Sequence, residues 1–174
     1  KKQRLTQFST DLLKYPHYWK TGSKVQDIIA KYNSIDPGTR LTDTEESLIG
    51  RIRRKRSAGK KLYFYTILTN NHLFQVMTDI KSFHDPEAFK KVNKMVSHGD
   101  IIGVKGYIAK TRKGELSIVP SHMELLTPCF AILPHSHYGI VDKELRYRHR
   151  YIDLVVNDHV RQIFITRHKI ISFL

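Results

Sequence analysis

Cysteine is nearly absent from this chain of 174 residues: Cys129 is the only one. A single thiol excludes an internal disulfide framework, so a reducing compartment is the default and we predict a cytoplasmic location. Long hydrophobic runs are also missing, and no stretch approaches the roughly 20 apolar residues that cross a bilayer. The first residues, KKQRLTQFSTDLLKY, lack the uninterrupted apolar stretch of a secretory signal. We therefore expect neither a membrane-spanning protein nor a disulfide-stabilised one.

Acidic residues are scarce, with 16 Asp and Glu against 30 Lys and Arg, and the formal net charge is +14. Such an excess of positive charge predicts a polyanionic partner, either a nucleic acid or an anionic membrane surface. We favour nucleic acid, because the chain lacks membrane-directed segments. Hydrophobic residues make up 40% of the chain, which is enough for one compact domain with appended structure or for two small domains.

Clusters with catalytic or metal-binding chemistry are missing as well. His135 and His137 have no cysteine or carboxylate at ligand spacing, so we expect no metal. Cys129 has no evident activating base, and we interpret it as a small buried hydrophobic residue. The glycines of GDIIGVKG (99–106) match no phosphate-binding loop and predict close packing of strands.

Hydrophobic periodicity predicts a helical extension over residues 1–44. Two groups recur at helical spacing, one at Leu5, Phe8 and Leu12 and the other at Val25, Ile28, Ile29 and Tyr32. Residues 129–157 are interpreted as a connector, within which the charged run 142–154 is either an exposed linker or a helix with ion pairs. Helical spacing over 158–174 continues to the last residue, so we expect a truncated helix and a longer protein.

Residues 45–128 predict a mainly β domain. Five strand-like segments occur in the order ESLIGRIRRKR, KKLYFYTILT, HLFQVMTDI, DIIGVKGYIAK and ELSIVPSHMELL. A helix that starts at Asp85, Pro86 and Glu87 separates the third segment from the fourth. This order is that of an OB-fold, a five-stranded barrel that commonly binds oligonucleotides.

Cations and aromatic rings adjoin each other in this domain. Seven cations and no acid occur between Arg51 and Lys61, and Tyr63, Phe64 and Tyr65 follow directly. A basic run alone is often only a solvated surface, but more cations return on the predicted neighbouring strand and loop, at Lys105, Lys110, Arg112 and Lys113. Cations attract the phosphates of a single strand and rings stack on its bases, so the pattern favours single-stranded nucleic acid.

Alternation along the second strand places Phe64 on one face and Tyr63 and Tyr65 on the other. Periodicity does not decide which face is buried, because both are largely apolar. If pairing keeps Phe64 and Gln75 on one face, a base could stack on the ring and be read by the amide.

Motifs along nearly the whole chain resemble the amino-terminal part of class II lysyl-tRNA synthetases, most closely the eukaryotic cytosolic type. They are YPHYW, KRSAG, LYFY, FQVM, GDIIGVKG, KGELSI, LLTPCF, LPHSHYG and DKELRYRHRYIDL. The resemblance implies that the barrel binds the anticodon of lysine tRNA. It also implies that residues 129–157 connect to a class II catalytic domain of which 158–174 are the truncated start. The longer protein would be a homodimeric ligase that uses ATP and magnesium, while the fragment alone is not catalytic.

The family's anticodon-contact pattern falls on Arg56, Phe64, Gln75 and Glu115. The resemblance implies that Phe64 stacks on the middle uridine, that Gln75 and Glu115 bond to base edges, and that Arg56 contacts bases or backbone. It assigns Tyr63, Tyr65, Phe74 and Val76 to the core. We expect further nucleic-acid contacts from the cations Arg51, Lys55, Arg112 and Lys113.

Three alternatives stay open at this point. The domain could be an OB module that binds single strands without reading them, or the equivalent domain of an aspartate or asparagine ligase. It could also belong to an inactive relative in which the barrel serves other partners.

Overall fold

The computed structural model describes residues 16, 18–22, 24–83, 85–131, 133 and 139–174. It divides into two compact units, one up to residue 131 and one from residue 132 onward. The predicted helix around Leu5, Phe8 and Leu12 and the pair His135 and His137 lie outside the described residues.

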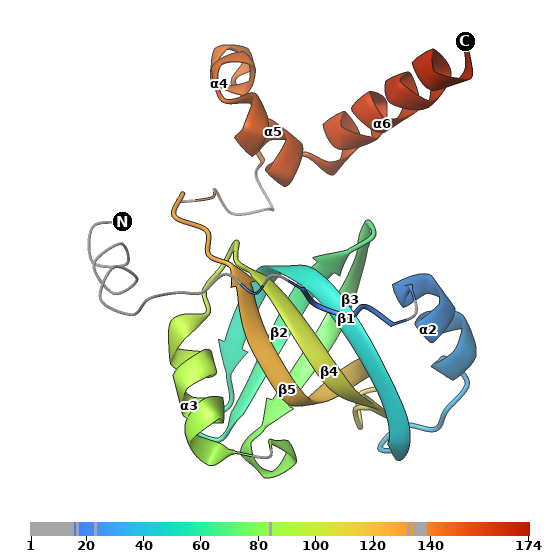
Figure 1. Cartoon of the computed structure of the whole chain (residues 1–174), viewed down its shortest axis with the longest axis vertical. Helices are drawn as coiled ribbons and strands as arrows, with labels where there is room; N and C mark the ends of the chain where they lie inside the picture. The colour runs from blue at the N-terminus through green and yellow to red at the C-terminus, as the bar shows by residue number, and fades with distance from the viewer. Residues whose placement is uncertain (1–15, 17, 23, 84, 132, 134–138) are drawn as a thin grey trace. The chain divides into compact units, whose positions relative to one another are not determined.

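The first unit is a closed five-stranded barrel, which confirms the predicted OB-fold (Figure 1). Its strands are β1 (Arg40–Ser57), β2 (Leu62–Thr69), β3 (His72–Asp79), β4 (Ile101–Lys110) and β5 (Leu116–Thr127). They are arranged in the closed order β1-β2-β3-β5-β4, in which the β3–β5 pair is parallel and the other pairs are antiparallel. β1 starts at Arg40, upstream of the predicted start at residue 45, and a register shift between Leu41 and Glu46 interrupts its pairing with β4.

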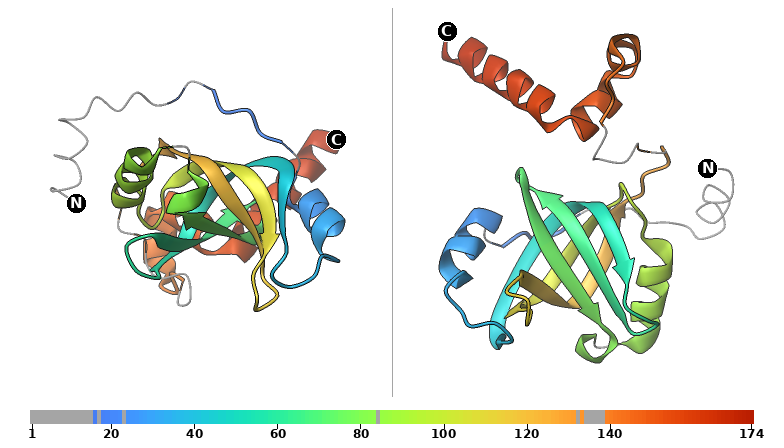
Figure 2. Two further views of the ribbon diagram at one scale, coloured as in Figure 1. Left: turned by 90° about the horizontal axis from the view of Figure 1, so that it is seen from below. Right: turned by 180° about the vertical axis from the view of Figure 1, so that it is seen from behind.

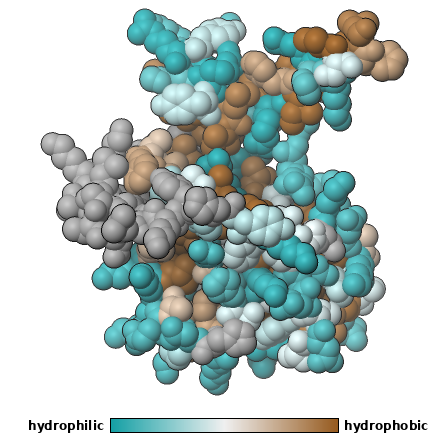
Figure 3. Space-filling view, in the orientation of Figure 1, coloured by the Kyte–Doolittle hydropathy of each residue, from teal (hydrophilic) through white to brown (hydrophobic). Residues whose placement is uncertain are grey.

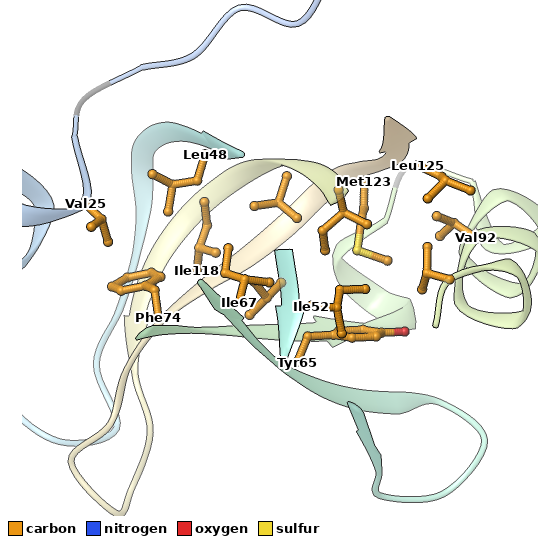
Figure 4. Close-up of a cluster of buried hydrophobic side chains, with 14 of the residues drawn as sticks. Val25, Leu48, Ile52, Tyr65, Ile67, Phe74, Val92, Ile118, Met123 and Leu125 are labelled. Atoms are coloured by element: carbon orange, nitrogen blue, oxygen red, sulfur yellow. The ribbon is translucent and has the colours of Figure 1, made fainter. Parts of the chain in front are cut away.

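The barrel interior settles which face of β2 is buried. Figure 4 shows Ile52, Tyr65 and Ile67 together in the buried cluster, and all three are fully buried. Phe74 and Val76 of β3 lie in the same cluster, as the resemblance implied for them and for Tyr65. Tyr63 is only partly buried and packs at the edge of this core.

Two glycines of β4 allow close packing, and of the two Gly106 shows the strand packing that the sequence predicted. A β-carbon on Gly103 would lie 2.5 Å from the ring of Trp19. A β-carbon on Gly106 would overlap the backbone of Val119 on β5. Cys129 is half-buried rather than fully buried.

Helices lie at opposite sides of the barrel (Figures 1 and 2). After a 3₁₀ turn η1 (Ile80–Ser82), α3 (Pro86–Met95) begins where predicted, because the Asp85 side chain accepts a hydrogen bond from the Glu87 N–H. Its apolar face includes Phe89 and Val92, which are buried in the core. On the other side, α2 (Val25–Tyr32) confirms the second helix predicted in the extension and buries Val25 and Ile28.

The second unit contains α4 (Lys143–Arg148), α5 (Arg150–Val156) and α6 (Asp158–Phe173). The charged run 142–154 is therefore helical rather than an extended linker. Asp153 is fully buried and accepts hydrogen bonds from Arg146 at 3.0 Å, from Arg150 and from Asn157 at 2.7 Å. Burial opposes its ionisation, but hydrogen bonds from Asn157 and Arg146 and the two arginine charges outweigh burial and lower the Asp153 pKa.

Apolar side chains gather at the end of α6, where Ile170, Ile171, Phe173 and Leu174 are exposed (Figure 3). Across the described residues, none of the helices is both long and apolar enough to traverse a bilayer.

Candidate nucleic-acid interface

The outward face of β1, β2 and β3 brings three of the four predicted anticodon residues together. Pairing of β1 with β2 sets Arg56 directly opposite Phe64, and the guanidinium carbon lies 5.8 Å from the ring centre. Pairing of β2 with β3 sets Phe64 opposite Met77 and Thr66 opposite Gln75. Because alternate residues share a face, Phe64 and Gln75 lie on the same side of the sheet. This shared face is the arrangement that would let one base stack on the Phe64 ring and be read by the Gln75 amide.

The fourth predicted residue, Glu115, reaches this face from the start of β5. Closure of the barrel pairs Gln75 with Ser117 in parallel. As a result, the Gln75 amide Nε2 donates a hydrogen bond of 2.7 Å to Glu115 Oε2. The Glu115 backbone N–H donates to the Thr111 hydroxyl at 3.0 Å, which holds the start of β5 in place.

Phe64 is half-buried, and its ring is supported from one side. It packs against a small cluster formed by Met77, Ala109 and Val119, separate from the main core. Arg56 beside it is exposed. A ring that is held by its neighbours and only half-buried keeps part of its surface available for a stacked base.

A surface hollow of about 440 Å³ adjoins these residues. Its lining comes from β2, β3, the β4–β5 loop and α2, and includes Thr66, Leu73, Gln75, Glu115 and Asn33. Leu73 is 62% exposed and contributes apolar surface to the hollow. The hollow therefore combines apolar surface with the amide and carboxylate that can read a base edge.

Exposed cations surround this face. Arg112 and Lys113 are exposed in the β4–β5 loop, where Gly114 has a φ of +85° that closes the turn. Arg54 is exposed and pairs with Thr66, so it lies on the same face as Arg56. We did not select Arg54 as a candidate from the sequence, although its spacing of two residues from Arg56 would have identified it.

The structure places Lys55 elsewhere. Its ammonium donates to the backbone oxygens of Asn93 at 2.5 Å and Val96 at 2.9 Å, at the carboxyl end of α3. A cation there interacts favourably with the helix dipole. Lys55 and Arg56 are neighbours in one strand and must face opposite sides, so only Arg56 belongs to the interface.

Other predicted cations also have partners within the protein. Arg51 lies on the outward side opposite Leu68, and its guanidinium donates to the Gly99 oxygen at 2.8 Å. Lys110 donates to the oxygens of Asn33 and Ile35 after α2. Four cations on this face or in the β4–β5 loop are exposed, namely Arg54, Arg56, Arg112 and Lys113.

Comparison with known proteins agrees with the barrel fold. Residues 47–126 match a family model described as a tRNA anti-codon, OB-fold nucleic acid binding domain. A lysine–tRNA ligase of Cladosporium cladosporioides is 39% identical over 92% of this chain and 27% of its own length. Lysine–tRNA ligases of Nostoc punctiforme and Prochlorococcus marinus are 34% and 36% identical over 98% and 92% of this chain. The chain spans only 31% and 32% of those two relatives.

Proposed function

Because this chain belongs to the lysine–tRNA ligases, as the part that carries their OB-fold anticodon-binding domain, we propose that its barrel binds the anticodon loop of lysine tRNA. The observation that supports this most strongly is the convergence of Arg56, Phe64, Gln75 and Glu115 on one face. These residues come from four segments of the chain: pairing of β1, β2 and β3 brings the first three together, and closure of the barrel through β3 and β5 adds Glu115.

Each residue has a distinct part in the proposed complex. Phe64 stacks on the middle uridine of the anticodon, which excludes water from one side of the base. Gln75 and Glu115 contact the edge of that base, where hydrogen bonds carry sequence information. Arg56 contacts base or backbone, while Arg112 and Lys113 attract phosphates of the loop.

The activity of the longer protein is part of the same proposal. We propose that it joins lysine to its tRNA with ATP and magnesium, acts as a homodimer and works in the cytoplasm. The barrel holds the anticodon so that the acceptor end reaches a catalytic part outside this chain. Among the described residues, no cluster of three or more His, Cys, Asp or Glu side chains is placed to hold a metal ion.

A competition experiment tests the anticodon assignment. A labelled stem-loop with the lysine anticodon UUU is displaced by unlabelled stem-loops with lysine, aspartate or CCC anticodons, and by poly-U. We expect the lysine loop to compete at least about tenfold better than the CCC loop, a difference of about 1.4 kcal/mol. Tighter binding of the aspartate loop would favour the aspartate ligases instead.

A module that binds single strands without reading them is the second candidate. It is favoured by the net charge of +14 together with a half-buried aromatic ring on the outward face of the barrel. Equal competition by all stem-loops and by poly-U would support this candidate and overturn the anticodon assignment.

A further inference from the structure

We propose that Ser117 is a positioning residue, which fixes the Gln75 amide so that only its oxygen is available to a bound base. This inference rests on the proposed function, since it concerns how the same site selects a uridine. It assigns a role to a residue that the sequence patterns did not single out.

Both N–H groups of the Gln75 amide are used inside the protein. Nε2 donates to Glu115 Oε2 at 2.7 Å and to Ser117 Oγ at 3.0 Å. The Ser117 hydroxyl in turn donates to the Glu115 backbone oxygen at 3.3 Å, so its lone pair is free to accept from Gln75. The three residues form one directional chain of hydrogen bonds.

The carboxylate determines which end of the amide faces it. An ionised carboxylate only accepts hydrogen bonds, whereas an amide has a donating end and an accepting end. Turning the Gln75 amide over would place its oxygen against Glu115 and also remove the donor from Ser117. The orientation of this amide is therefore determined by chemistry, although amide nitrogen and oxygen are similar in shape.

The Gln75 oxygen is the polar atom left over. The residue is 8% exposed, and Ser117 is fully buried. Within the part of the chain that the structure describes, the Gln75 oxygen has no hydrogen-bond partner. A nearly buried acceptor without a partner is costly unless a ligand or water supplies a donor.

An acceptor at this point selects between pyrimidines. Uracil carries an N–H at its N3 position, whereas cytosine has a lone pair there. The Gln75 oxygen attracts the first and repels the second. Arg56, on the same face, can donate to a carbonyl oxygen beside that N–H. Ser117 thus contributes to specificity without touching the base.

The test compares affinities for lysine stem-loops with uridine or cytidine at the middle position. Ser117→Ala leaves one amide N–H unpaired, which can then be offered to cytidine N3. Glu115→Gln replaces the carboxylate by an amide that can donate as well as accept, so the Gln75 amide no longer has to direct an N–H toward residue 115. We expect both variants to reduce the uridine-to-cytidine affinity ratio at least fivefold. The matched control is Ser121→Ala on β5, the strand that also carries Ser117. It removes a hydroxyl that donates to the Lys105 oxygen on β4, and it should leave the ratio unchanged.

A ratio in Ser117→Ala equal to that of the unchanged protein would overturn the role of Ser117. If Ser117→Ala does not fold, Ser117→Cys decides, because a thiol fills the space of the hydroxyl but accepts the Gln75 N–H only weakly. A second measurement is independent of RNA: both Gln75 side-chain amide protons should exchange slowly by NMR, and one should lose protection in Ser117→Ala. Absence of stem-loop binding by the unchanged protein would refute the proposed function alone, and the exchange measurement would still decide whether Ser117 holds the amide.

Discussion

Replacing Phe64 by alanine removes the proposed stacking surface and should weaken binding of the lysine anticodon stem-loop. The ring lies beside Arg56, with the guanidinium carbon 5.8 Å from the ring centre, and on the same face as Gln75. A base placed on this ring would therefore be within reach of both side chains. Alanine leaves those two residues in place but removes the aromatic surface on which the base would stack.

The magnitude follows from the exposure of the ring. Stacking of one base on an aromatic side chain is worth about 1–3 kcal/mol, so we expect a loss of about ten- to a hundredfold in affinity. The inner edge of Phe64 packs against Met77, Ala109 and Val119, so alanine also lowers the free energy of unfolding. Since the ring is only half-buried, this cost should be less than the 3–5 kcal/mol of a fully buried phenylalanine.

Two further substitutions at this position separate packing from stacking. Phe64→Leu keeps apolar contact with Met77 but has no flat face, and should bind nearly as weakly as the alanine variant. Phe64→Tyr keeps the ring, and should bind within about twofold of the unchanged protein. Affinity is measured by fluorescence anisotropy below the unfolding transition of each variant, with Tyr18→Ala as an exposed aromatic control. Unchanged affinity in Phe64→Ala would refute the stacking argument.

Two more predictions concern charge. Lys113→Met should reduce the slope of log affinity against log salt concentration by about 0.7. Lys55→Met should leave that slope unchanged and lower the unfolding temperature, because Lys55 binds the end of α3. Equal slopes in the two variants would contradict the assignment of Lys113 to the nucleic acid and of Lys55 to the helix. Asp153→Asn should destabilise the helical unit by about 3 kcal/mol, since it leaves two arginines without their buried carboxylate. The folded pKa of Asp153 is lowered, so its stabilisation is present above pH ~3.9 and lost as pH falls through the folded value. Circular dichroism against pH should show this acid transition in the unchanged protein, and its persistence in Asp153→Asn would argue against the assignment.

Local features of the fold could be predicted because they depend on neighbouring residues. A pair of asparagines between two strand segments is a sequence signal for a hairpin, and Asn70 and Asn71 form such a two-residue loop with φ values of +46° and +67°. Positive φ at both positions is typical of the turn that matches the twist of paired strands, and asparagine tolerates it. Asp85 and Pro86 likewise marked the start of α3, because capping and a fixed φ act within one turn of chain.

The two faces of β2 could not be distinguished in this way. Tyr65 and Phe64 are both aromatic, and alternation separates them without saying which is inside. The resemblance to lysyl-tRNA synthetases assigned Tyr65 to the core, and the structure agrees: Tyr65 is fully buried, and its hydroxyl donates to Asn93 at 2.6 Å. That contact exists only because α3 covers one end of the barrel.

The roles of Lys55 and Ser117 could not be predicted from the sequence either, the first because a predicted site residue lies elsewhere and the second because a contacting residue was not predicted. Lys55 belongs to the basic run and was expected to bind nucleic acid, yet it holds the end of a helix 38 residues away. Ser117 carried no signal in the sequence, yet it contacts Gln75 at a separation of 42 residues. Neither contact could be predicted from the spacing of residues in the sequence. Docking of α3 on the barrel creates the first, and pairing of β3 with β5 creates the second.

The sequence by itself determined the composition of the binding surface: its positive charge, its aromatic strand, the order of strands and helix, and the motifs of a lysine–tRNA ligase. These follow from residue chemistry and from periodicities of two to four residues. Only the tertiary structure decided which cations face the solvent, which ring of β2 lies inside the barrel and which way the Gln75 amide is turned. Those properties depend on contacts between segments about 40 residues apart, which form when β3 pairs with β5 and the barrel closes.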